Sequence, residues 1–207
     1  MKHGEVIKLD SGLVMRRAKV SDVQDLLTLY FTIYGSNYPL ALGTDRTVMQ
    51  KIIQEKDSLW LVIVDPDKNT LCASAVFEVD VFFKIARAEG FVTHPYYQSK
   101  GLASILLNHA SDYLMKDNKI VNSIYATTRT LSVSPQLVFI KNKFKPLGIF
   151  PNAHRLASYE TLTLMAKHDP EVLKKRARIE EVPEALGPIF KASEKYIKSP
   201  QIGRAHV

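Results

Sequence analysis

A short polar turn between an apolar run and a helical pattern holds the residues of this chain that could most directly do chemistry. The turn reads Gln98-Ser99-Lys100-Gly101-Leu102-Ala103, and the apolar pair Phe91-Val92 lies shortly before it. Apolar residues then recur at helical spacing as far as Tyr113. Because the first turn of a helix has no internal acceptors for its N–H groups, this junction predicts a phosphate-binding site.

Apolar periodicity places strands and helices around this turn. Residues 59–64 form a continuous apolar run, which is typical of a strand buried on both faces. We expect an α/β (α+β) fold, in which a mixed, mostly antiparallel sheet of about six or seven strands is flanked by helices. Ser21 and either Thr44 or Asp45 are expected to cap the first two helices, and residues 146–151 to form a loop. The predicted order is β-α-α-β-β-β-α-β-α-β, with strands at 13–18, 59–64, 71–81, 85–93, 122–128 and 159–166 and helices near 21–30, 45–53, 101–115 and 135–141.

The composition is that of an ordinary globular domain. Of its 207 residues, 46% are hydrophobic and 24% are charged. No apolar run reaches membrane-spanning length, and the first seven residues lack the apolar core of a signal peptide. The single cysteine, Cys72, cannot form an internal disulfide. We therefore expect a cytoplasmic protein with a buried Cys72, no membrane partner and no metal site.

The C-terminal part of the chain differs in character. From Asp169 the chain turns helical and charged, so we expect a domain over residues 1–168 and a charged helical extension over 169–201 that is truncated. Residues 202–207 read as the translation of a sequencing-adapter oligonucleotide and carry no functional meaning. Much of the net charge of +7 arises late in the chain, but acidic residues interleave with the basic ones. This pattern favours a solvated helical face over binding of nucleic acid.

The turn and its surroundings resemble the GNAT family of N-acetyltransferases. The acyl-CoA pyrophosphate loop of that family has the pattern Arg/Gln-x-x-Gly-x-Gly/Ala, which Gln98 to Ala103 fit, and the strand order over residues 13–167 is similar. The resemblance implies transfer of acetyl from acetyl-CoA to a primary amine by direct attack in a ternary complex. A looser similarity to β-lysine N-acetyltransferase-like proteins, which suggests a small amine or amino-acid-like acceptor, comes from residues 125–129, 134–135, 151–152 and 160–161.

The same resemblance implies how the donor is held. Backbone N–H groups from Ser99 through Lys100, Gly101 and Leu102 to Ala103 would bind the pyrophosphate of CoA, with Gly101 allowing close approach of the backbone. Lys100 either adds positive charge or is an ordinary solvated lysine, and Gln98 replaces the more common Arg and loses its charge assistance. The strand edge Phe91-Val92-Thr93 would bind the pantetheine arm and the thioester, and the helix that carries Ser134 and Phe139 would complete the cofactor-binding set.

The resemblance also implies the catalytic groups. Attack on a thioester requires a neutral amine, so a base or a water relay must take its proton. Glu89 is the candidate base because the family places its glutamate on this strand; the alternative is an ordinary strand carboxylate paired with Arg87 or a lysine. His94 could relay a proton or serve a surface role beside Pro95.

A general acid is missing from its usual place. The resemblance aligns Phe139 with the tyrosine that often protonates the leaving thiolate, and phenylalanine has no proton to give. Either Tyr125, Ser132 or Ser134 acts instead, or the thiolate leaves without an acid. Unassisted departure is feasible because a thiol with a pKa of about 8.5 gives a tolerable leaving group.

The acceptor groove of the family lies near the loop after the first helix. Here that loop carries Tyr34 and Tyr38, which either line a substrate pocket or pack the loop.

Three functions stay open: an active N-acetyltransferase, a degenerate domain that binds CoA as a sensor or scaffold, and a nucleic-acid-associated protein that uses the basic C-terminal segment. The oligomeric state is open as well and includes a homodimer.

Overall fold

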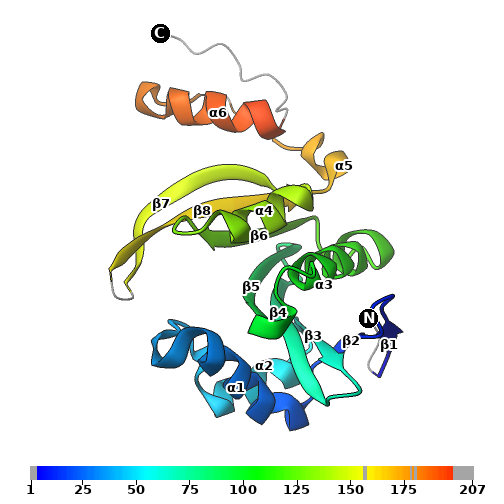
Figure 1. Ribbon diagram of the computed structural model, residues 1–207. Coiled ribbons are helices and arrows are strands. Elements are labelled where there is room, and N and C mark those ends of the chain that lie inside the picture. Colours follow the sequence, from blue (N-terminus) through cyan, green and yellow to red (C-terminus); the bar gives the residue numbers. More distant parts are fainter. Residues whose placement is uncertain (1–3, 156–157, 178, 180, 198–207) are drawn as a thin grey trace.

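A sheet of eight strands organises the part of the chain that the structure describes (Figure 1). This computed structural model describes residues 4–155, 158–177, 179 and 181–197. The strands lie in the order β1-β2-β3-β4-β5-β6-β8-β7, and neighbours are antiparallel except for β5 and β6, which are parallel. They are β1 (Val6–Lys8), β2 (Val14–Arg17), β3 (Ser58–Asp65), β4 (Thr70–Asp80), β5 (Ile85–Thr93), β6 (Ser123–Arg129), β7 (Lys145–Arg155) and β8 (Tyr159–His168).

Helices border the sheet and divide its apolar side chains into two cores. One core lies under α1 and α2 and contains Trp60 and Val62 of β3, while the other lies under α3 and contains Leu59, Leu61 and Ile63 of the same strand. Successive side chains of a strand point to opposite faces, so β3 contributes to both cores and is apolar throughout. The α-helices are α1 (Val23–Tyr34), α2 (Arg46–Gln54), α3 (Leu102–Ser111), α4 (Val133–Lys141), α5 (Pro170–Leu173) and α6 (Gly187–Ile197), and a π-helical turn over Asp112–Asp117 extends α3.

Most of the predicted elements are confirmed, including the cap of α2, where Asp45 accepts hydrogen bonds from two N–H groups. The predicted cap at Ser21 is wrong: a 3-10 turn over Val20–Asp22 precedes α1, and Asp22 pairs with Arg16 at 2.6 Å. The predicted loop at residues 146–151 is also wrong, because these residues belong to β7. This strand is at the edge of the sheet and has irregular register, a position where proline is tolerated.

The C-terminal extension begins with α5 and continues to α6, which lies beside β7 in Figure 1. The Ser193 hydroxyl of α6 donates a weak hydrogen bond of 3.5 Å to the carbonyl of Leu147 in β7. The predicted adapter-derived residues 202–207 lie outside the described residues. No helix among the described residues is long and apolar enough to cross a membrane.

A bulge in β5 opens the sheet next to its parallel pair. Val76 of β4 pairs with Glu89, but Ser74 pairs with Val92, so β5 contains one extra residue. Gly90 lies in this bulge with a φ of +64°, a conformation that glycine adopts readily. The pairing of β5 with β6 ends at Arg87 and Tyr125. Beyond that point β5 has no partner strand on its β6 side, and the two strands separate.

Candidate active site

The predicted phosphate-binding turn leaves a row of backbone donors free. Gly101 is the N-cap of α3, with a φ of +74°, and Ser99 also has a positive φ of +62°. Among the described residues, none of the N–H groups from Ser99 to Ala103 donates to another part of the chain. A Cβ at position 101 would meet no atom within 4 Å, so lack of space is not the reason for glycine there. The positive φ is the reason, because other residues rarely adopt it. The open space above Gly101 leaves room for a ligand.

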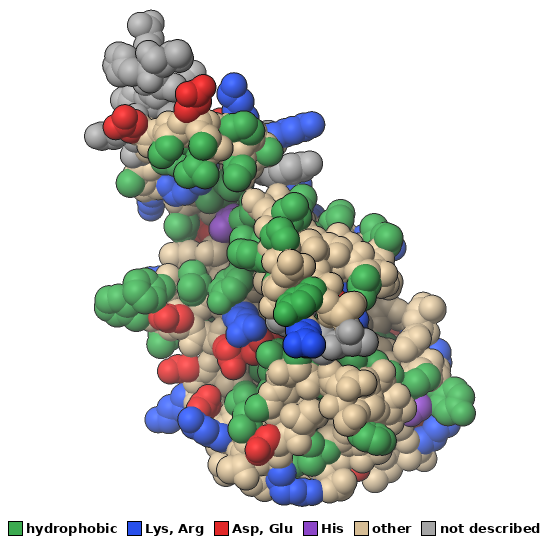
Figure 2. Space-filling view, turned by 90° about the vertical axis from the view of Figure 1, so that its left-hand side faces the viewer, with side chains coloured by type: hydrophobic (Ala, Val, Ile, Leu, Met, Phe, Trp, Pro, Cys, Tyr) green, Lys and Arg blue, Asp and Glu red, His purple; other side chains and the backbone are tan. Residues whose placement is uncertain are grey.

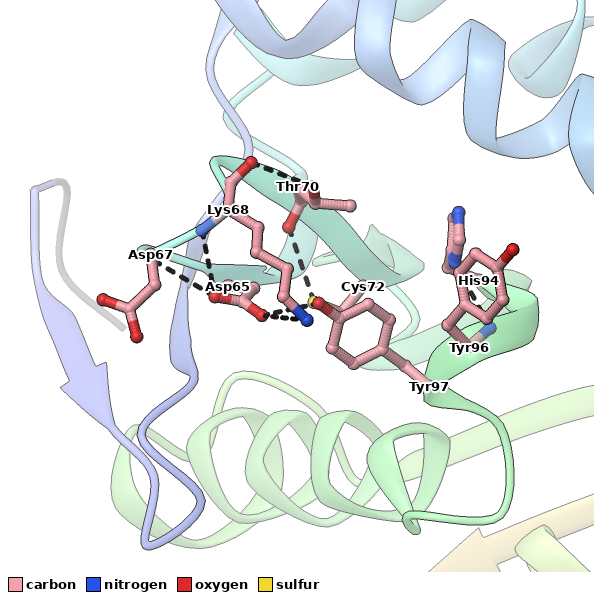
Figure 3. Close-up of polar contacts among 8 residues, drawn as sticks. All are labelled: Asp65, Asp67, Lys68, Thr70, Cys72, His94, Tyr96 and Tyr97. Carbon is pink, nitrogen blue, oxygen red and sulfur yellow. Dashed lines mark hydrogen bonds and ion pairs between the residues drawn. The ribbon is translucent and has the colours of Figure 1, made fainter.

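Tyr97 anchors the residues just before this turn (Figure 3). Its hydroxyl donates a 2.5 Å hydrogen bond to Asp65 at the end of β3, and this bond holds the pKa of the Asp65 carboxyl below its usual range. The Lys100 ammonium lies 4.9 Å from the centre of the Tyr97 ring, a favourable cation–π distance. His94 accepts a hydrogen bond from the N–H of Tyr96. It therefore has a structural role in the turn, where Figure 3 shows it beside Tyr96.

A cavity of about 160 Å³ lies where β5 and β6 separate. Figure 2 shows acidic and basic side chains gathered in the hollowed middle of this face, between the lower and upper parts of the molecule. The walls come from the end of α1 and the loop after it, from β5 and β6, and from α4 and β8. The lining residues are Tyr34, Tyr38, Pro39, Leu40, Arg87, Ala88, Glu89, Gly90, Phe91, Thr127, Thr128, Arg129, Pro135, Phe139 and Leu162.

Glu89, the predicted base, lies in this cavity at the bulge. Its side chain is only 9% exposed, and its Oε2 atom lies 2.9 Å from Nη2 of Arg87. The predicted alternative, an ion pair with Arg87, is therefore also present, but the contact lacks hydrogen-bond geometry and leaves Oε2 without a donor in the described structure. Burial, opposed by Arg87 and assisted by Glu78, raises the pKa of Glu89 to about 7. Glu89 can thus exchange a proton near neutral pH.

Tyr34 and Tyr38, the predicted acceptor residues, line the same cavity as Glu89. Their rings lie 4.8 Å apart, and Tyr38 also packs at 4.9 Å against Tyr30. The two tyrosines therefore pack the loop and also border the cavity, and their role in binding an acceptor stays a prediction. Burial raises the pKa of both phenols, so their hydroxyls stay protonated and can donate hydrogen bonds.

The helix α4 places an apolar ring in the cavity and none of the serines that were considered as proton donors. Phe139 is 4% exposed and packs edge-on against Phe91 and Phe144, so its ring forms an apolar wall of the cavity. Ser134 is exposed in the first turn of α4, and Ser132 is the N-cap residue. Neither serine lines the cavity, nor does Tyr125, the third residue considered as an acid.

Two arginines complete the cavity, and neither was predicted to be part of the site. Arg87 is two residues before Glu89 on the same face of β5. Because strand side chains alternate with a period of two, the sequence could have shown that Arg87 lies beside Glu89. Arg129 of β6 forms two hydrogen bonds of 2.6 Å to Glu160 of β8. These two residues are 31 positions apart, so no local pattern could have joined them. Among the described residues, no group of three or more His, Cys, Asp or Glu residues could hold a metal ion.

A bulged strand that separates from its parallel neighbour, beside a helix N-terminus with free backbone donors, is the arrangement typical of an acyl-CoA-dependent transferase. The model of the acetyltransferase (GNAT) family matches residues 21–133, which is more than half of the chain. The protein therefore belongs to the GNAT acetyltransferase family, and the predicted family and fold are confirmed.

Solved structures share this fold at low sequence identity. The ribosomal-protein-S5-alanine acetyltransferase from Vibrio fischeri superposes with a TM-score of 0.67 at 15% identity, over 80% of this chain and 97% of that one. Mutant forms of the spermidine/spermine N-acetyltransferase SpeG from Vibrio cholerae give a TM-score of 0.65 at 17% identity, over 80% and 99%. A GNAT-family acetyltransferase from Streptococcus pneumoniae gives 0.63 at 17%, over 75% and 98%. No curated protein matches the sequence.

Proposed function

We propose that this enzyme transfers acetyl from acetyl-CoA to the primary amine of a small acceptor, with Glu89 as the base. The observation that carries the proposal is the position of Glu89: a buried carboxylate with a pKa near 7, at the point where β5 separates from β6. In a ternary complex the amine nitrogen forms a bond to the acetyl carbonyl carbon and loses a proton to Glu89, directly or through water. The carbon–sulfur bond then breaks, and CoA leaves as a thiolate.

The donor would lie along the open edge of β5. Its pyrophosphate would bind the free N–H groups from Ser99 to Ala103, where the helix dipole of α3 favours negative charge. The pantetheine arm would lie along Phe91, Val92 and Thr93, beyond the last pairing with β6. Ser134 and Phe139 remain the predicted donor contacts on α4.

The leaving thiolate departs without a protein acid in this proposal. Tyr34 and Tyr38 carry hydroxyls in the cavity, but burial raises the pKa of both phenols. A phenol with a pKa above about 10 gives its proton to a thiolate only uphill, because the thiol has a pKa of about 8.5. These tyrosines therefore orient the acceptor by hydrogen bonds, and solvent protonates the thiolate.

The test is the release of CoA thiol from acetyl-CoA in the presence of a panel of primary amines. We expect at least one amine to support turnover and E89Q to lower kcat by about 10²–10⁴-fold, as removal of a general base does. The matched control is E55Q, which removes an exposed carboxylate at the end of α2, outside the cavity lining, and should leave kcat within about threefold.

Phe139 favours the second candidate function, a domain that binds CoA without turnover. Its packed ring stands where the family often has a proton donor. If acetyl-CoA raises the melting temperature but no amine in the panel releases thiol, the sensor function is correct and the enzymatic proposal is wrong. If acetyl-CoA does not raise the melting temperature, both the enzymatic proposal and the sensor function are wrong.

A further inference from the structure

Arg129, held by Glu160, forms one wall of the cavity. Nε and Nη2 of Arg129 donate to the two oxygens of Glu160 at 2.6 Å each, a bidentate arrangement. The Glu160 side chain is 3% exposed, whereas that of Arg129 is 40% exposed. Glu160 is absent from the lining of the cavity, while Arg129 is part of it. The buried carboxylate therefore holds the guanidinium from behind and fixes its orientation.

The outward side of Arg129 has unused hydrogen-bond donors. A guanidinium has five N–H groups, and only two of them bond to Glu160; the other three have no acceptor among the described residues. Tyr34 lines the cavity close enough for its ionisation to respond to both Arg129 and Glu160. Its hydroxyl has no hydrogen-bond partner in the described part of the chain. Arg129 and Tyr34 thus present several unused donors to the cavity.

The charges that face the cavity are unfavourable for a polycation. Arg87 and Arg129 carry permanent positive charge, and among the described residues that line the cavity Glu89 is the only carboxylate. Glu89 is paired with Arg87, and the counter-charge of Arg129 is Glu160, which lies behind the guanidinium and outside the cavity lining. A second ammonium group on the acceptor cannot accept hydrogen bonds from the free N–H groups of Arg129, whereas an anionic group can.

We propose that the acceptor carries a carboxylate as well as the amine that is acetylated, and that Arg129 and Tyr34 bind this carboxylate. The proposal rests on the proposed function, because the amine must reach Glu89 for transfer. A planar carboxylate matches the free edge of one guanidinium and one phenol. The structural neighbour SpeG is a spermidine/spermine N-acetyltransferase. The free donors of this cavity assign a different acceptor class, an amino acid rather than a polyamine.

The experiment compares acceptors that differ only in the carboxylate. Thiol release from acetyl-CoA is measured with 5-aminopentanoate against butylamine, with lysine against cadaverine, and with spermidine as the polycation. We expect the carboxylate member of each pair to have a kcat/KM at least about tenfold higher, and spermidine to be among the poorest acceptors.

Variants assign the preference to the proposed subsite. Y34F leaves the ion pair intact and is expected to lower kcat/KM about three- to tenfold for the carboxylate acceptor only. R129Q should lower it by about 10–100-fold, with little change for the decarboxylated amine. Because R129Q leaves Glu160 buried without its partner, the double variant R129Q/E160Q provides the same test in a charge-balanced protein.

The outcomes separate this inference from the proposed function. If the decarboxylated amines or spermidine are the better acceptors, or if R129Q/E160Q lowers both members of a pair equally, the carboxylate subsite is refuted while acetyl transfer stands. If no acceptor releases thiol, isothermal titration in the presence of CoA decides the inference. Tighter binding of 5-aminopentanoate than of butylamine, lost in R129Q/E160Q, would support the subsite, and equal binding would refute it.

Discussion

The proposed donor loop and the proposed acceptor cavity of this protein are built in different ways. The loop from Ser99 to Ala103 offers backbone N–H groups of consecutive residues, so a six-residue pattern describes it completely. The cavity is made of side chains from α1, β5, β6, α4 and β8, which are distant in the sequence. Backbone geometry that recognises a common cofactor can therefore be read from a local motif, whereas a pocket for a particular acceptor depends on tertiary structure.

Substitution of Gly90 in the bulge is expected to have the largest effect on the cavity side of the molecule. In G90A the new Cβ would lie 2.7 Å from the Tyr30 hydroxyl and 3.0 Å from Leu42, in a backbone with a φ of +64°. We expect a loss of about 2–4 kcal/mol in the free energy of unfolding, measured by chemical denaturation, because overpacking and backbone strain add. Turnover should fall while the Kd for CoA changes little.

Two further variants serve as controls for this prediction. G148A places a methyl group where no atom lies within 4 Å and φ is not positive, so it should be nearly neutral. Y30F in the G90A background removes the closest clash together with the hydrogen bond from Tyr30 to the Gly90 carbonyl. Recovery of part of the lost stability would assign the effect to this contact, and an unfolding energy for G90A equal to that of the wild type would refute the role of the bulge.

The donor loop should show the opposite pattern in G101A. The substitution meets no neighbouring atom but forces alanine into a φ of +74°, which costs about 1–2 kcal/mol and turns the free N–H groups. We expect the Kd for CoA, measured by isothermal titration, to rise about tenfold. The KM for the amine should stay within a factor of about two. A larger effect on the amine than on CoA would show that the two regions are not separable.

Much of the fold could be predicted because its signals are local. The apolar run of β3 and the alternation around β5 identified the centre of the sheet, and the turn before α3 identified the donor loop. The edge strand β7 was missed because Pro146 and Pro151 read as loop residues, although an edge strand with irregular register accepts them. The first helix cap was misassigned to Ser21 because an intervening 3-10 turn cannot be read from the residue types.

The acceptor side of the site could be predicted only in part. Glu89, Tyr34 and Tyr38 were identified through the family resemblance, and they do lie around one cavity. The bulge had a sequence signal in Gly90, since an isolated glycine in a strand often marks one. Arg129 and Glu160 lie in segments that carry the looser resemblance, but their pairing had no signal, because its geometry depends on the register between β6 and β8.

The most direct test of the central claim, that Glu89 removes the proton of the amine, is the pH dependence of kcat/KM for the amine at saturating acetyl-CoA. Glu89 acts as a base only when deprotonated, and burial raises its pKa to about 7, so activity should increase as pH rises through this value. In the wild type the slope of log kcat/KM against pH should decrease by one unit near pH 7. In E89Q this break should be absent, and a break near pH 7 that persists in E89Q would contradict the account.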